Sequence, residues 1–546
     1  MRFQFTDENK RDYVPADKLY EPSKDAGHGF LTEVNRNKYE RLQIPELNDG
    51  FNEVFWYQGE KITNIVSDNT GAYVDYDGQG ELPLSFVCNL PKEGNYKVKV
   101  KFEAACDIKE AKVFLGRRRL CYLGSIRKGE SVETKSLANI CPIIARGSDK
   151  PTEDLTLDVT LLGRGIHLQE IEISDWGGPT VYIAGDSTVT DQSAAYPYLP
   201  WNSYAAWGQM LSFFVGNEFA ISNHAHSGLT TESFRAEGHY QILADRVKKG
   251  DYVFFQFGHN DQKLMNLKAD EGYRDRLEEY INEIKEKGAT PVIISPLARN
   301  SWKREGETTS YNDLLAEYAK ECELIAKEQE VPFIDLHQKA MNLIVSLGRD
   351  KAKSYFFPGD YTHTNDYGAY LFASMIFEGL KAAGIVSANQ VDVLWQPPEE
   401  TIDLVIPKEY KNRKNPDAVN LFDNLERPED FLTRVEAMDF IIKTCKFFPT
   451  NVYNDYFEDV IGHEIYAGIV ECACQNGMIT EEMTKDGRFY PNKPITRGEF
   501  KTSLINGYSA RMTISDAVLD FLGDELDLDS LIKRREAADI CRGLSV

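Results

Sequence analysis

The chain has 546 residues, too many for one hydrophobic core, so we expect about two to four domains. Its 62 basic and 86 acidic residues give a net charge of −24, which makes nucleic acid and anionic membrane surfaces poor partners. A membrane-spanning helix needs about 18 consecutive apolar residues, and no stretch of the chain comes near that length. The opening MRFQFTDENKRDYV lacks the apolar segment of a secretion signal.

The nine cysteines are scattered, and the one close pair is Cys472 and Cys474. No second Cys or His pair stands at a zinc-ligand spacing. The pattern predicts reduced thiols, no disulfide framework and no metal site.

From about residue 50 to 175 the apolar residues alternate with polar ones. YKVKVKF (96–102) and LTLDVTL (155–161) show this period of two most clearly. Several such strands separated by glycine-rich turns predict a β-sandwich, which we assign to residues 1–178.

Short apolar runs then alternate with amphipathic helices across residues 179–385. The runs YVFFQF (252–257), PVIIS (291–295) and VPFIDL (331–336) are predicted strands, and 273–288 and 367–383 are predicted helices. This alternation predicts a parallel sheet with helices on both faces and a ligand site at the carboxyl ends of the strands.

Residues 386–430 are polar and proline-bearing, and they predict a linker. Residues 431–546 are predicted to be helical. They contain a weak repeat, LTRVEA (432–437), ITRGEF (495–500) and IKRREA (532–537), and each copy opens a helix-like stretch.

The stretch VYIAGDSTVTDQ (181–192) ends an apolar strand on Gly185 and places Ser187 directly after it. Taken by itself, this pattern is explained by a serine that caps the following helix. Three later stretches favour a catalytic serine: Gly228 in a loop, Asn260 at another strand end, and Asp360 with His363 before the last helix. An amide at Asn260 suits an oxyanion, and an Asp-x-x-His pair suits a general base.

Taken together and in this order, Ser187, Gly228, Asn260 and His363 resemble the four signature residues of SGNH (GDSL-type) hydrolases. The resemblance covers about residues 179–385 and implies a three-layer, flavodoxin-like α/β domain within a multidomain chain. AGDSTV, FGHNDQK, YPYLPWNSYAAWGQ and DYTHTNDYGA are similar to blocks of the rhamnogalacturonan acetylesterase branch of carbohydrate esterases. The early segment through DAGHGF resembles the galactose-binding-like β-sandwich of bacterial members.

One departure concerns the second block, where Leu229 and Thr230 follow Gly228 instead of an Arg-Ser sequence. The resemblance implies that Ser187 attacks an acetyl carbonyl while His363, oriented by Asp360, accepts its proton. The backbone N–H groups of Ser187 and Gly228 and the Asn260 amide would hold the oxyanion. No cofactor or metal is implied.

Three residues are candidates for substrate contact. Tyr198 and Trp201 lie in an aromatic loop where a ring could stack on a sugar, although both could equally pack the loop. Arg299 could pair with a uronate carboxylate, with a solvated arginine as the alternative.

The carboxyl-terminal triplet resembles S-layer homology repeats, a family that docks bacterial proteins onto cell-wall polysaccharide. The third copy has Ile532 and Lys533 where the others have a threonine before the arginine. Such repeats imply export, whereas the amino terminus and cysteines favour a cytoplasmic enzyme that trims imported oligosaccharides. We therefore expect a cytoplasmic location, with attachment to the bacterial cell surface as the alternative.

The leading functional hypothesis is a deacetylase of acetylated pectin-type, rhamnogalacturonan-like glycans. Acetyl-xylan or another O-acetylated polysaccharide is the second hypothesis, because the same triad would serve it. A non-catalytic polysaccharide-binding surface protein is the third. A lipase is disfavoured because no helical lid with an exposed apolar face precedes the site. The oligomeric state is left open by the sequence.

Overall fold

The computed structural model describes most of the chain: residues 1–6, 12–20, 27–31, 65–76, 81–144, 150–194, 198–305, 308–357, 360–387, 394–398, 425, 427–445, 447, 456–460, 466–484, 486–510 and 527–544. The chain forms two compact units. The first unit comprises residues 1–299, 313–346 and 362–396, and the second comprises 300–312, 347–361 and 397–546.

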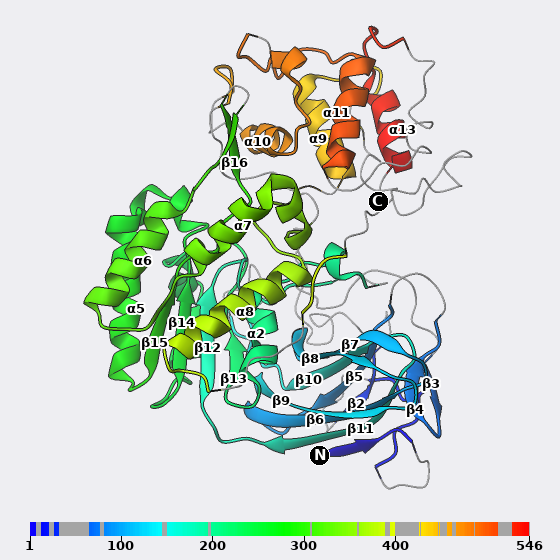
Figure 1. Cartoon of the computed structure of the whole chain (residues 1–546), viewed down its shortest axis with the longest axis vertical. Helices are drawn as coiled ribbons and strands as arrows, with labels where there is room; N and C mark the ends of the chain where they lie inside the picture. The colour runs from blue at the N-terminus through cyan, green and yellow to red at the C-terminus, as the bar shows by residue number, and fades with distance from the viewer. Residues whose placement is uncertain are drawn as a thin grey trace. The chain divides into compact units, whose positions relative to one another are not determined.

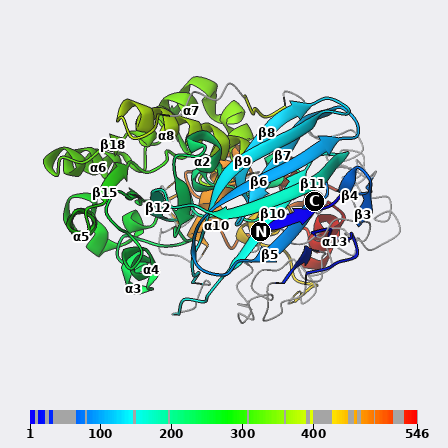
Figure 2. The same ribbon diagram turned by 90° about the horizontal axis from the view of Figure 1, so that it is seen from below.

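The first unit begins with a β-rich region made of two antiparallel sheets (Figure 2). Its strands are β1 Arg2–Gln4, β2 His28–Phe30, β3 Ile65–Asp68, β4 Gly71–Val74, β5 Leu84–Asn89, β6 Gly94–Ala104, β7 Ile108–Leu115, β8 Arg119–Ile126, β9 Ser131–Ile140, β10 Thr156–Leu162 and β11 Ile166–Asp175. One sheet has the order β3-β4-β11-β6-β9 with β1 beside β11, and the other has the order β2-β5-β10-β7-β8.

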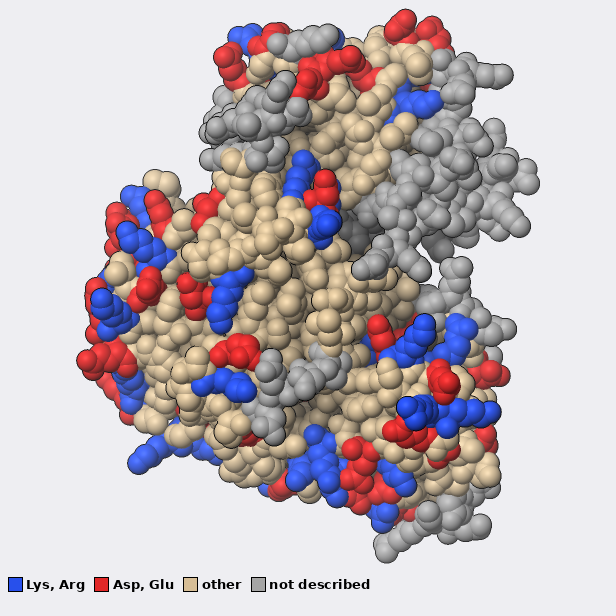
Figure 3. Space-filling view, viewed as in Figure 1, with Lys and Arg blue, Asp and Glu red and all other residues tan. Residues whose placement is uncertain are grey.

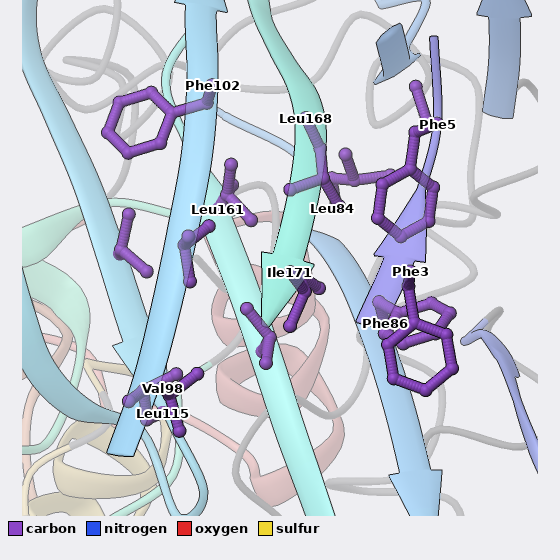
Figure 4. Packing of buried hydrophobic residues seen from close by; sticks show 14 of the residues in the cluster. Phe3, Phe5, Leu84, Phe86, Val98, Phe102, Leu115, Leu161, Leu168 and Ile171 are labelled. Carbon is purple, nitrogen blue, oxygen red and sulfur yellow. The ribbon is translucent and has the colours of Figure 1, made fainter. Parts of the chain in front are cut away.

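The period-two pattern accounts for this region. In β6, Tyr96, Val98 and Val100 are buried, whereas the lysines between them are at least partly exposed. The inward-facing residues of both sheets form one hydrophobic cluster, which includes Phe3, Phe86 and many aliphatic side chains (Figure 4). The predicted strands in 96–102 and 155–161 are therefore confirmed.

A five-stranded parallel sheet follows in the order β13-β12-β14-β15-β18. Its strands are β12 Thr180–Gly185, β13 Ala220–Asn223, β14 Tyr252–Gln256, β15 Thr290–Ile294 and β18 Phe333–Ile334. The main helices around it are α2 Trp207–Val215, α4 His239–Ala244, α5 Arg274–Glu286, α6 Ala316–Glu328, α7 Leu336–Ala352 and α8 Asp366–Ala382. Shorter turns are η1 Pro200–Asn202, α3 Ser233–Ala236, η2 Asp261–Lys263, η3 Met265–Leu267 and η4 Ala269–Tyr273, while η5 Lys353–Tyr355 and residues 347–352 at the end of α7 belong to the second unit.

Helices cover both faces of this sheet, as the sequence predicts (Figure 1). On one face, α5 and α6 pack in a cluster that includes Tyr182, Phe255 and the partly buried Phe333. The next residue after Phe333, Ile334, points to the opposite face and contacts Gly379 of α8, where a Cβ atom would lie 2.7 Å from the Ile334 side chain. Alternation along each strand thus gives both faces an apolar surface.

The second unit contains a hairpin of β16 Trp302–Glu305 and β17 Thr308–Tyr311 and a group of short helices. These are α9 Arg434–Thr444, α10 Ala467–Gln475, η8 Glu481–Thr484, α11 Arg497–Ser509 and α13 Arg534–Leu544. The three repeat motifs open α9, α11 and α13, as predicted. Thr433 and Thr496 cap the first two helices in capping boxes with Glu436 and Glu499.

Backbone hydrogen bonds join the three repeats in a closed cycle. Leu432 donates to the Ile532 carbonyl, Ile532 donates to Ile495, and Ile495 donates back to Leu432. Ion pairs follow the same threefold pattern: Arg434 with Glu499, Arg497 with Glu536, and Arg534 with Glu436. The third repeat, although it lacks the threonine, completes the cycle.

The predicted boundaries near 178, 385 and 430 remain predictions, and most of the predicted linker 386–430 lies outside the described residues. Acidic and basic side chains are interspersed over the face shown in Figure 3. The acidic side chains are scattered over this face, just as the acidic residues are spread along the sequence.

Arg434→Met should destabilise the second unit by about 2–3 kcal/mol, because the buried guanidinium donates to the Met483 and Phe489 carbonyls as well as to Glu499. The measurement is calorimetric unfolding of the full chain. Lys533→Met is the control, since the Lys533–Glu429 pair is exposed and should contribute less than about 1 kcal/mol. Equal transitions for both variants would contradict a structural role for the cycle.

Candidate active site

The turn after β12 presents Ser187 at the carboxyl edge of the parallel sheet. Asp186 accepts hydrogen bonds from the Thr188 backbone (2.9 Å) and hydroxyl (2.8 Å), which close the turn. Gly185 is required here, because a Cβ atom would lie 2.7 Å from the Gln256 carbonyl oxygen. The serine is half-buried, so its hydroxyl remains reachable while the backbone around it is fixed.

His363 reaches this serine from the loop before α8. Its Nε2 lies 2.8 Å from Ser187 Oγ. The loop is held in place by Thr364, which donates to the Ala205 carbonyl and accepts from the Ala205 N–H. The Tyr204 ring lies edge-on to the imidazole with a centroid separation of 6.0 Å. A neutral His363 in this position can accept the hydroxyl proton of Ser187.

The two predicted oxyanion loops lie side by side. Asn260 Nδ2 donates to the Leu229 carbonyl over 2.9 Å, which places the amide next to the loop of Gly228. Gly228 has φ +85°, a conformation that favours glycine. The structure thus brings Asn260 and Gly228 together at the edge where Ser187 stands. Their role as oxyanion donors stays a prediction.

Asp261 ties the same two loops together. Its carboxylate accepts from the Thr231 backbone (2.8 Å) and hydroxyl (2.6 Å), and from the Gly258 N–H (3.0 Å). Burial raises the pKa of this carboxyl to about 6. Asp261 therefore fixes the strand-end loop of Asn260 against the loop of Gly228.

Asp186 and His259 form a buried pair beneath the nucleophile turn. The two side chains are 0% and 2% exposed, and Asp186 Oδ2 lies 3.5 Å from His259 Nδ1. Burial lowers the pKa of His259, so the ring is neutral at pH 7. The sequence shows His259 among the polar residues after β14 but gives no signal for this pairing.

Lys263 is a second residue that sequence reasoning missed. Its Nζ donates to Asn260 Oδ1 over 2.8 Å. This bond orients the amide, whose Nδ2 then donates to the Leu229 carbonyl. Desolvation and the positive charge of Arg299 lower the pKa of Lys263 to about 8. The position of Lys263 three residues after Asn260 in a single turn is the signal that could have found it.

The predicted substrate residues lie in different environments. Tyr198 is 1% exposed, and its hydroxyl donates to the buried Asp366, so its ring packs inside the protein, as in the alternative reading of this loop. Trp201 is half-buried in η1. Arg299 is 5% exposed and donates to the His259 carbonyl. It is therefore a buried arginine and not the solvated one that the sequence offered as the alternative. Sugar contact by Trp201 and Arg299 stays a prediction.

Asp360 is half-buried, and its backbone N–H donates to the Phe357 carbonyl. Its role as the carboxylate that orients His363 stays a prediction. Within the described residues, no group of three or more His, Cys, Asp and Glu side chains is placed to hold a metal ion. The described helices include none long and apolar enough to cross a membrane.

A serine hydroxyl within hydrogen-bond distance of a histidine, at the carboxyl edge of a parallel sheet, is the arrangement of a serine hydrolase. Residues 183–371 match the model of the GDSL-like lipase/acylhydrolase family. Three curated relatives are similar over the same share of the chain.

Rhamnogalacturonan acetylesterase RhgT of Bacillus subtilis (strain 168) is 32% identical over 218 residues, which cover 38% of this chain and 90% of the relative. Probable rhamnogalacturonan acetylesterase YesY of the same organism is 30% identical, with 38% and 94% covered. A rhamnogalacturonan acetylesterase of Emericella nidulans is 30% identical, with 38% and 86% covered. The chain belongs to the GDSL-like lipase/acylhydrolase family and is an esterase of the SGNH type.

Residues 456–501 match the S-layer homology domain. This match confirms the resemblance seen in the carboxyl-terminal repeats. It points to a protein at the cell surface or secreted, the alternative raised from the sequence. The S-layer homology match does not support the cytoplasmic location that we expected from the amino terminus and the cysteines.

Lys263→Met should remove an alkaline limb from the pH profile of ester hydrolysis. Below about pH 8 the protonated Lys263 donates a charge-assisted hydrogen bond to Asn260, and above it the amine is neutral and a weaker donor. We therefore expect kcat/KM of the parent to fall above about pH 8, and the variant to be several-fold less active with no such fall.

The substrate for this test is a neutral acetyl ester, and Lys268→Met is the control. Lys268 is an exposed lysine that pairs with Glu271. An unchanged alkaline limb in Lys263→Met would show that Lys263 does not act on the oxyanion position.

Proposed function

We propose that this protein is a carbohydrate O-acetylesterase that removes acetyl groups from rhamnogalacturonan or related pectin-type glycans. The observation that carries the proposal is the 2.8 Å contact between Ser187 Oγ and His363 Nε2. The substrate class is supported by relatives named as rhamnogalacturonan acetylesterases. A purely glycan-binding protein would have no need of this contact.

In the first half of the proposed reaction, Ser187 Oγ attacks the acetyl carbonyl carbon and His363 Nε2 accepts the hydroxyl proton. The carbonyl oxygen becomes an oxyanion, for which the Asn260 amide and the Ser187 and Gly228 N–H groups are the proposed donors. Each donor contributes on the order of 3 kcal/mol in the transition state. The C–O bond to the sugar then breaks, and His363 returns the proton to the sugar oxygen.

In the second half, His363 accepts a proton from water, and the water oxygen attacks the acetyl-serine. Collapse of the second oxyanion releases acetate, and the proton from His363 restores the Ser187 hydroxyl. Asp360 is the proposed carboxylate that fixes the imidazole tautomer. Because only neutral His363 accepts a proton, activity should require that ring to be deprotonated.

We further propose that the β-rich region is a galactose-binding-like sandwich and that the carboxyl-terminal repeats dock the enzyme on cell-wall polysaccharide. The threefold cycle of ion pairs uses the three repeat arginines inside the unit. Wall binding would therefore depend on Arg434 and Arg497 through the fold of the repeats.

The substrate proposal is tested by measuring acetate released from acetylated rhamnogalacturonan, acetylated homogalacturonan and acetyl-xylan. We expect rhamnogalacturonan to give the highest kcat/KM. A preference for acetyl-xylan would replace the pectin proposal by the second hypothesis, for which the Leu229 departure is the sequence argument. No acetate from any glycan, with hydrolysis of small acetyl esters intact, would refute a carbohydrate substrate.

Ser187→Ala should lower kcat on p-nitrophenyl acetate by about 1,000-fold or more, because it removes the nucleophile. The half-buried hydroxyl contributes little packing, so the thermal midpoint should stay nearly unchanged. The double variant Ser187→Ala/His363→Ala should lose little further activity, since the two residues act as a unit. Retention of most activity in Ser187→Ala would refute the nucleophile assignment.

A further inference from the structure

The turn between β7 and β8 carries an arginine that is wholly buried. Arg118 is 0% exposed and has φ +55°, an uncommon conformation for a residue other than glycine. It belongs to the β-rich region by sequence and by strand pairing, because Leu115 and Arg119 on either side of the turn are paired in the sheet. Its guanidinium, however, bonds to residues of the hydrolase domain.

One side of the guanidinium holds the loop of His363. Arg118 Nη1 donates to both carboxylate oxygens of Asp366 at 2.8 Å, and Asp366 stands three residues after His363. Arg118 Nη2 donates to the carbonyl of Tyr204, whose ring contacts the His363 imidazole. The buried carboxylate also accepts from the Tyr198 hydroxyl.

The other side holds the loop of the nucleophile. Arg118 Nε donates to the Gln192 carbonyl over 3.2 Å, and the Gln192 side chain donates to the Ser187 carbonyl over 2.7 Å. The neighbouring Arg119 adds a second anchor to this loop through Asp191, at 2.9 Å. A single side chain therefore touches both segments whose separation sets the Ser187–His363 contact.

We propose that Arg118 is a positioning residue that holds the nucleophile loop and the histidine loop in register, so that the β-rich region is an integral part of the active site. This inference rests on the proposed catalytic roles of Ser187 and His363. It does not depend on which acetylated glycan is the substrate.

The charges explain why the arrangement is held so firmly. Arg118 and Asp366 are both wholly buried, and an unpaired charge at either position would be strongly unfavourable. Burial raises the pKa of Asp366, and Arg118 opposes that rise. Without Arg118 the Asp366 carboxylate loses the partner that binds both its oxygens, and the Tyr204 and Gln192 carbonyls each lose one donor, although Gln209 still donates to Gln192.

The test uses the full chain and compares Arg118→Met, Arg118→Lys and Asp366→Asn with the parent protein. Rates are measured on p-nitrophenyl acetate, and Ser187 is labelled with a fluorophosphonate, at a temperature well below each melting midpoint. Both readouts report the Ser187–His363 pair whatever the natural glycan is. A failure to release acetate from glycans would thus refute the proposed substrate without touching this inference.

For Arg118→Met we expect kcat and the labelling rate to fall about tenfold to a hundredfold, because small displacements of reacting groups are costly, with KM nearly unchanged. Arg118→Lys keeps the charge but has all its donors on one nitrogen, which cannot reach the three separate partners of Nε, Nη1 and Nη2, so its loss should be intermediate. In the double variant Arg118→Met/Asp366→Asn, the two losses should not multiply, because both changes break the same link.

Leu161→Ala is the matched control, since Leu161 is wholly buried in the core of the β-rich region. It should lower the melting midpoint and leave kcat within about twofold. The inference is overturned if Arg118→Met lowers only the melting midpoint, or if Leu161→Ala lowers kcat equally. If Arg118→Met does not fold, unchanged kcat in both Arg118→Lys and Asp366→Asn overturns it.

Discussion

The 2.8 Å contact between Ser187 and His363 joins two loops that are 176 residues apart in the sequence. The serine is fixed by β12, which pairs on both sides with parallel strands and ends on a glycine that lets the turn pass close to β14. The loop of the histidine is fixed by the start of α8 and by the hydrogen bonds of the next residue, Thr364, to Ala205 just before α2. A displacement of about 1 Å between the two would reduce catalysis by about a hundredfold, so the surrounding structure must fix both loops independently.

Buried charge is one means by which this chain fixes such geometry. A buried ion pair adds little net stability compared with apolar residues, but it tolerates few arrangements other than the paired one. Arg118 with Asp366 applies this constraint beside the site, and the buried Arg434 with the partly exposed Glu499 applies a weaker form of it between two repeats of the second unit. In both places the guanidinium also donates to backbone carbonyls, so the charge pair orients whole loops as well as side chains.

Local patterns in the sequence were sufficient to predict the strands of the β-rich region, the parallel sheet and the helices of the repeats, because burial imposes a period of two or of 3.6 residues. The strand-end residues Ser187 and Asn260 were predictable because parallel strands end at one edge. Contacts between distant segments were not. Nothing in the pattern around Arg118 marks it as buried, and the aromatic loop of Tyr198 is equally compatible with sugar contact and with packing, yet both side chains bond to Asp366 far along the chain.

The electrostatics of the candidate site differ from those of the whole protein. The net charge is −24, but salt screens exposed charges beyond about 8 Å, so distant surface acids contribute little at the reacting carbonyl. Close to Asn260 stand Lys263, which bonds to its side chain, and the buried Arg299, whose charge lowers the pKa of Lys263. Two cations in this position favour a developing negative charge on a carbonyl oxygen. An acidic protein can therefore hold an anionic intermediate, because the groups within a few ångströms determine the local field.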